Sequence, residues 1–354
     1  MKDTYTLNDT SKQRLEAIAN LTRIPSPTGY TQVIIQYIAN QLEQWGVDYQ
    51  KTAKGAIIVT CEGQENDKHR FVTAHVDTLG AMVRSIKSDG RLKIDLIGGF
   101  MFNAIEGEYC QIHVSANQKI VTGTILMHQT SVHVYKEART AERNQANIEV
   151  RLDAPVKNEE DVRALGINVG DFISFDPRVV ITENGFIKSR HLDDKVSVAL
   201  LLELIQKIQH KELQLGHTTH FYFSNNEEIG YGGNSNIDGR VVEYLAVDMG
   251  AMGDDQQTDE YSVSICVKDG SGPYHFGLRQ QFVELCQIRQ IPYQLDIYPH
   301  YQSDASGAMY AGIDVRHGLI GAGIDASHAF ERTHAQSVDA TFYLIEAYLS
   351  TSID

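Results

Sequence analysis

The pattern of strand-like and helix-like runs changes near residue 80 and changes back near residue 185. This interruption restricts the fold more than any other feature of the sequence. Inside it, short β-like runs such as RLKIDLIG, YCQIHVS and NIEVRLD follow one another closely, separated by turn residues. Closely spaced short strands predict a small all-β domain. Outside it, strand-like runs alternate with segments of helical spacing, which predicts an α/β sheet flanked by helices.

The interruption divides the chain into two predicted domains. Residues 1–78 and 185–354 form an α/β domain with a mixed sheet, and residues 79–184 form an inserted, β-barrel-like domain. A length of 354 residues supports this division, because one hydrophobic core rarely serves so long a chain. The predicted helices of the larger domain cover residues 11–22, 31–45, 196–209, 275–290, 304–311 and 337–350. Its predicted strands cover residues 55–61, 70–77, 219–224, 243–249, 262–267, 293–297 and 317–322.

Charge and hydropathy argue against several classes of partner. The net charge is −15, which argues against binding to the phosphate backbone of nucleic acids. No apolar run approaches the roughly 18 residues of a membrane helix, and the N-terminus lacks an apolar signal segment. The four cysteines form no CxxC pair and suit buried, reduced thiols. We therefore expect a cytoplasmic protein with no membrane partner.

A histidine and an aspartate, His75 and Asp77, end one predicted strand. Residues two apart on a strand point to the same face, so Asp77 could orient the ring of His75. A carboxylate in that position is the usual support of a metal-bound histidine. The alternative is a polar strand end that faces solvent.

Two pairs of adjacent carboxylates also lie next to apolar segments. Asp193 and Asp194 precede the strongly apolar helix at 196–209, where a single aspartate would be enough for a cap. Glu227 and Glu228 follow the apolar strand THFYFS. Burying adjacent like charges is costly without compensation, and α/β sheets place their sites beyond the carboxyl ends of strands. Exposed loop carboxylates are the alternative for the glutamates.

Three further candidates lie later in the chain. Asp248 closes the apolar run LAVD and is either a turn former or a site residue. The segment DASHAFERTH supplies His328, soon after a predicted strand, and His334, just before the final helix. The nearby GAGIDA imitates a dinucleotide-binding fingerprint but lacks a following strand–helix–strand context, so we reject that function.

Together these residues favour a site for two divalent cations. Imidazole and carboxylate ligands without thiolates suit Zn²⁺, Co²⁺ or Mn²⁺. Two such ions roughly 3.5–4 Å apart need a bridging carboxylate, which explains why so many acids stand at predicted strand ends.

At this point the sequence resembles the tetrahedral (TET) metallo-aminopeptidases, which include glutamyl and deblocking aminopeptidases and belong to the clan of co-catalytic zinc exopeptidases. The resemblance spans nearly the whole chain, including the β insert in an α/β core. The motifs that carry it are AHVDTLGAMV, SRHLDDKVSVALLLE, NNEEIGYGG, AVDMG and DASHAFERTH.

The resemblance implies metal ligands at His75, Asp193, Glu228, Asp248 and His328, with Asp193 as the bridging ligand. His328 departs from the family pattern, because many members have a proline-containing approach to this histidine and a following serine. Here the approach is GIDAS and the next residue is alanine.

The same resemblance implies two catalytic carboxylates and leaves one ligand open. Glu227 resembles the general base, and Asp77 resembles the group that orients His75 and supports catalysis. His334 is the rival of His328 as the last ligand, and we prefer His328 because it is closer to the strand end.

The implied function is hydrolysis of N-terminal residues from peptides, with Glu227 deprotonating a metal-activated water. The resemblance also implies a cytosolic homo-oligomer, a dodecamer, with the insert as an oligomerisation domain. The sequence motifs SRHLDDK and ERTH resemble those of a branch of the family associated with the metabolism of osmolyte dipeptides. One alternative is therefore an amidohydrolase or deacylase of a small N-acylated or osmolyte-type dipeptide. Another is a non-catalytic module that binds metal or peptide during assembly.

Overall fold

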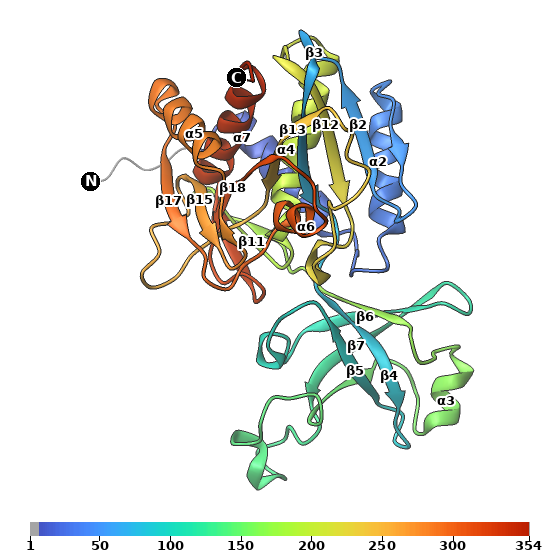
Figure 1. Cartoon of the computed structure of the whole chain (residues 1–354). Coiled ribbons are helices and arrows are strands. Elements are labelled where there is room, and N and C mark those ends of the chain that lie inside the picture. The colour runs from blue at the N-terminus through green and yellow to red at the C-terminus, as the bar shows by residue number, and fades with distance from the viewer. Residues whose placement is uncertain (1–6, 354) are drawn as a thin grey trace.

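The computed structural model describes residues 7–353. Residues 1–6 and 354, at the two ends of the predicted α/β domain, lie outside the described residues. Two units are visible in Figure 1: a larger one of strands and helices, and a smaller one made mostly of strands, with one short helix. Within the described residues, no helix is long and apolar enough to cross a membrane.

The larger unit is built on a ten-stranded sheet. Its main path runs β1–β2–β12–β3–β13–β18–β15–β16, with β14 beside β18 and β17 beside β15. The strands are β1 (Gln50–Lys51), β2 (Ile57–Cys61), β3 (Glu65–His75), β12 (His217–Ser224), β13 (Val241–Val247), β14 (Gly250–Ala251), β15 (Val263–Asp269), β16 (Gly272–Pro273), β17 (Tyr293–Ile297) and β18 (Arg316–Ile324). Strands β3, β12, β13 and β18 are parallel, whereas β2 runs antiparallel to β12 and β15 runs antiparallel to β18. At the far side of β15, strand β17 is parallel to it. The prediction of a mixed sheet is confirmed.

Alternation along the central strands separates two cores. Val72 and Ala74 of β3 belong to the larger core, whereas Phe71 belongs to the smaller core on the opposite face. The larger core is covered by α1 (Asp9–Thr22), α2 (Gln32–Gln44), α4 (Leu192–Gln209), α5 (Phe276–Arg289) and α7 (Ala335–Leu349). The short helix α6 (Asp304–Tyr310) contributes to the smaller core.

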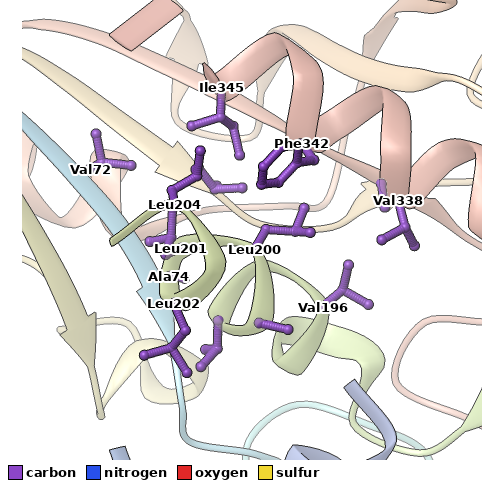
Figure 2. Packing of buried hydrophobic residues seen from close by; sticks show 14 of the residues in the cluster. Val72, Ala74, Val196, Leu200, Leu201, Leu202, Leu204, Val338, Phe342 and Ile345 are labelled. Carbon is purple, nitrogen blue, oxygen red and sulfur yellow. The ribbon is translucent and has the colours of Figure 1, made fainter. Parts of the chain in front are cut away.

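Helix α4 is the central helix of the larger core, which explains its unusually apolar sequence. Its residues are buried on nearly every side, because it packs against α1, α7 and β3. Figure 2 shows Leu200 and Leu204 of α4 beside Phe342 and Ile345 of α7, with Val72 of β3 nearby. A helix that is apolar all round is expected in such a place.

The smaller unit is a closed barrel in the order β4–β5–β8–β7–β6–β9. Its strands are β4 (Gly80–Ile86), β5 (Leu92–Ile97), β6 (Tyr109–Val114), β7 (Lys119–Met127), β8 (Ile148–Leu152) and β9 (Phe172–Phe175). It has its own apolar core, with helix α3 (Glu159–Ala164) contributing Val162. Closure removes the exposed edges that an open sheet of this size would have.

The chain also forms a separate three-stranded sheet, in which the strands pair in the order β10–β11–β19. It consists of β10 (Val180–Ile181), β11 (Phe186–Ser189) and β19 (Glu331–His334), which precede α4 and α7 along the chain. Val179 and Ile181 pack against the larger core rather than the barrel core. This small sheet brings the segment before α4 next to the segment after β18.

Candidate metal centre

The candidate residues meet at one edge of the large sheet. His75 is the last residue of β3, Glu227 and Glu228 open a 3-10 turn (Glu227–Ile229) after β12, and Asp248 follows β13. Because β3, β12 and β13 are parallel, their carboxyl ends lie at the same edge. Asp193 near the start of α4 and His328 between β18 and β19 complete the group.

The ring of His75 has two different environments. Its Nε2 atom lies 3.0 Å from Asp193 Oδ1, 3.8 Å from Glu227 Oε2 and 3.9 Å from Asp248 Oδ1. Its Nδ1 atom lies 2.9 Å from the carbonyl oxygen of Asp77 and 3.6 Å from the carboxylate Oδ1 of Asp77. An Nδ1–H that donates to the Asp77 carbonyl leaves Nε2 directed at the acids.

The carboxylate of Asp77 has a second set of contacts that sequence reasoning did not foresee. It accepts hydrogen bonds from the backbone N–H groups of Glu227 and Glu228, at 3.2 and 3.3 Å, and from the Thr28 hydroxyl at 2.7 Å. Asp77 therefore supports both His75, through its backbone, and the glutamate turn, through its side chain.

Asp193 lies between the two histidines. Its Oδ1 faces His75, and its Oδ2 lies 3.4 Å from Nε2 of His328. The same Nε2 atom lies 3.6 Å from Glu228 Oε2. The structure thus brings His328 to the acids. His334 lies elsewhere: its Nε2 faces the carbonyl of Asn184 and its Nδ1 accepts from the first turn of α7.

The loop that carries His328 is tied to the barrel unit. Nδ1 of His328 lies 2.6 Å from the carbonyl oxygen of Gly99, in the segment after β5. Arg190 donates to the carbonyl of Ala329 at 2.9 Å and to that of Ala104, and it pairs with Glu108 at 3.2 Å. Ala104 and Glu108 both lie between β5 and β6.

Burial and the two histidines shift the pKa values of the acids at this edge. Burial raises the pKa of Glu227 and Glu228 well above the ordinary range, and it raises that of Asp248 to about 7. Burial alone would lower the pKa of His328, but its contacts with Asp193 and Glu228 raise it to about 10. The two glutamates and Asp248 therefore favour a proton, whereas contacts with His328 and His75 lower the pKa of Asp193. A bound cation would satisfy the same carboxylates.

The donor set fits divalent cations. Two groups of potential ligands lie at this edge, and the ligand atoms of each group lie within 4.8 Å of one another. One group is His75, Glu227 and Asp248, and the other is His75, Asp193 and Glu228. Buried carboxylates with imidazoles are typical ligands of zinc-like cations. The candidate carboxylates and His328, but not His75, border a cleft of about 510 Å³. The same cleft is also lined by His300, Tyr301 and Gln302.

Two buried acids near the cleft escaped the sequence analysis. Glu331 opens β19, and Asp304 opens α6 with neither carboxylate oxygen hydrogen-bonded within the described residues. Burial raises the pKa of Asp304 to about 6. Ser303 is the N-cap of α6, and Asp304 follows it as an acidic residue in the first turn, a common position that carries no signal of a site. For Glu331, the spacing of three residues from His328 was the available signal.

Comparison with known proteins gives consistent matches. The family model described as M42 glutamyl aminopeptidase matches residues 55–344. YhfE of Bacillus subtilis (strain 168), whose name provisionally assigns it as an aminopeptidase, is 63% identical over 340 residues, covering 96% of this chain and 98% of YhfE. The Pyrococcus horikoshii TET1 peptidase, described as forming a tetrahedron or a large octahedral shell, superposes with a TM-score of 0.83 at 22% identity. That match covers 95% of this chain and 99% of the TET1 chain. Aminopeptidase APDkam598 of the archaeon Desulfurococcus kamchatkensis gives a TM-score of 0.86 at 21% identity, covering 97% and 96% of the two chains.

Proposed function

Because the chain belongs to the M42 glutamyl aminopeptidase family, we propose that it is a two-metal aminopeptidase that hydrolyses N-terminal residues from peptides. One observation carries the proposal furthest: the two oxygens of Asp193 face two different histidines, His75 and His328. A carboxylate placed in this way could serve as the bridging ligand that a pair of cations requires, which supports the proposal.

The ligand roles follow from these contacts. His75 and Asp248 would hold one ion, His328 and Glu228 the other, and Asp193 both. Zn²⁺, Co²⁺ and Mn²⁺ all suit this donor set. When bound, two such cations supply a water of lowered pKa and Lewis-acid polarisation of the substrate carbonyl.

Glu227 is the proposed general base. Its Oε2 lies 3.8 Å from Nε2 of His75, beside the candidate ligands, where the carboxylate could take a proton from the attacking water and return it to the leaving amine. The bonds from its backbone and that of Glu228 to Asp77 hold the turn that presents both side chains. Asp77 also fixes the ring of His75 through its carbonyl oxygen.

Metal removal and a matched substrate pair test the proposal. We expect the chelated protein to be inactive and Zn²⁺, Co²⁺ or Mn²⁺ to restore hydrolysis, because the ligand cluster supplies no other electrophile for the carbonyl. Aminoacyl amides with a free amine should be cleaved, and their N-acetylated counterparts should not. Release of amine is measured for both. Full activity of the metal-free protein contradicts the metal mechanism, and a preference for N-acetyl substrates favours a deacylase.

We also propose that the chain forms a homo-oligomer and that the barrel unit, predicted as residues 79–184, provides contacts between subunits. The barrel carries a run of exposed apolar side chains, with Val132, Val134 and Tyr135 at 51%, 71% and 38% exposure. Contiguous exposed apolar surface often marks a protein–protein contact.

The substitution Val134→Asp should weaken such an assembly roughly tenfold or more, because a charge would replace an apolar contact. The molar mass, measured by light scattering over a dilution series, should fall at concentrations where the wild type stays assembled. Val33→Asp, on an exposed site of α2, is the control. An unchanged mass for Val134→Asp would show that this part of the barrel is not an interface.

A further inference from the structure

Glu331 joins two of the candidate ligands through their backbones. Its Oε2 accepts a hydrogen bond from the N–H of Asp193, and its Oε1 accepts one from the N–H of His328, both at 3.1 Å. Asp193 and His328 come from distant parts of the sequence, and their side chains meet at 3.4 Å. A single carboxylate therefore spans the two segments that create this contact.

Neither of the two backbones has regular helical geometry. Asp193 has φ −75° and ψ 103°, outside the helical range, although it lies in the first turn of α4. His328 has a φ of +63°, the left-handed region that residues other than glycine seldom adopt. A residue other than glycine in the left-handed region persists when its surroundings hold it there, and such residues are common at functional sites.

Burying the carboxylate of Glu331 costs free energy, so stability alone does not explain its place. It is 2% exposed, and within residues 7–353 no lysine or arginine side chain forms an ion pair with it. The neighbouring Arg332 pairs with Glu260 instead. A buried carboxylate without a cationic partner costs free energy that two N–H bonds offset only in part.

We propose that Glu331 is a positioning residue that holds Asp193 and His328 in register for metal binding. The inference rests on the proposed function, since it gives Glu331 a task only if Asp193 and His328 are ligands. Glu331 acts through their backbones and leaves the side-chain donor atoms available to the cation. Outer groups of this kind typically contribute about 10–100-fold to metal affinity.

Two substitutions and one control test this role. In Glu331→Gln, the amide oxygen can accept one N–H bond, but the amide nitrogen faces the second N–H without accepting it. Glu331→Ala removes both acceptors. Glu260→Gln is the matched control, because Glu260 is also a buried carboxylate next to β19 and contacts none of the candidate ligands.

The experiment is a Co²⁺ titration of each metal-free protein, followed by visible absorption, with the melting temperature measured in parallel. We expect one of two binding steps to weaken about 10–100-fold in Glu331→Gln and further in Glu331→Ala. The control should bind Co²⁺ like the wild type, even if it melts earlier. Absorption of the bound cobalt should also change in the Glu331 variants, because ligand geometry is altered.

Three results would overturn the inference. Wild-type cobalt affinity in both Glu331 variants would show that the backbone bonds do not position the ligands. Lower melting temperatures with unchanged affinity in the folded protein would reduce Glu331 to a structural residue. A wild-type chain that binds no cobalt and cleaves no peptide would remove the proposed function, and this inference with it. The first two outcomes leave the proposed function intact.

Discussion

Glu227→Gln is expected to reduce kcat by about 10²–10⁴-fold, the range typical of losing a general acid–base. The amide cannot take a proton from the attacking water, yet it keeps the size of the side chain. The backbone bond from residue 227 to Asp77 should persist, so the glutamate turn should keep its shape. Metal content should remain that of the wild type. Steady-state kinetics together with metal analysis of the dialysed protein measure both quantities.

Glu228→Gln is the comparison that makes this result specific. The two glutamates are adjacent and both half-buried at the site, but only Glu228 Oε2 faces His328. Its amide variant should lose metal along with activity. Glu227 Oε2 lies 3.8 Å from His75 Nε2, which is close enough for a shared cation. Loss of metal in Glu227→Gln would therefore identify Glu227 as a ligand and end its assignment as the base.

Asp193→Asn is expected to have the largest effect on metal binding. An amide carries no negative charge and offers a single acceptor oxygen. It therefore cannot bind one cation on the His75 side and another on the His328 side. Affinity should fall by more than the roughly 10–100-fold typical of outer groups, and hydrolysis should be lost. Calorimetric titration of the metal-free variant measures the affinity and the number of ions bound.

Asp194→Asn is the matched control for this result. Asp194 is equally buried, but its Oδ2 accepts a hydrogen bond from the backbone N–H of His75, and an amide oxygen can accept the same bond. We therefore expect a milder loss. Two ions bound with wild-type affinity in Asp193→Asn would contradict the bridging role.

The sequence predicts the position of the site better than its internal contacts. Parallel strands in an α/β sheet bring their carboxyl ends to one edge, so His75, Glu227 and Asp248 could be placed together without a structure. The contact of Asp77 could not be derived in the same way. The i, i+2 argument assumes a continuing strand, but β3 ends at His75 and the chain then turns. The carboxylate of Asp77 consequently reaches the backbone N–H groups of the glutamate turn.

Glu331 shows why long-range contacts stay hidden in a single sequence. The segment ERTH has no periodicity long enough to predict a strand, and it becomes β19 only because β11 pairs with it. That pairing is a tertiary effect, since Ser189 and Glu331 are far apart in the sequence and opposite each other in the sheet. The role of Glu331 toward Asp193 depends on the same register. Local propensity carries little information about it.

The hydrogen bond between Nδ1 of His328 and the carbonyl oxygen of Gly99 couples the position of the His328 ring, at the edge of the large sheet, to the barrel unit. A displacement of the segment after β5 must break or strain that bond, and Arg190 adds a second connection between the same two regions. The free energy of holding the imidazole in place is thus distributed over both units. Linkage is reciprocal: whatever stabilises this arrangement of the barrel favours the same ring orientation, and a ligand that fixes the ring stiffens the barrel in return.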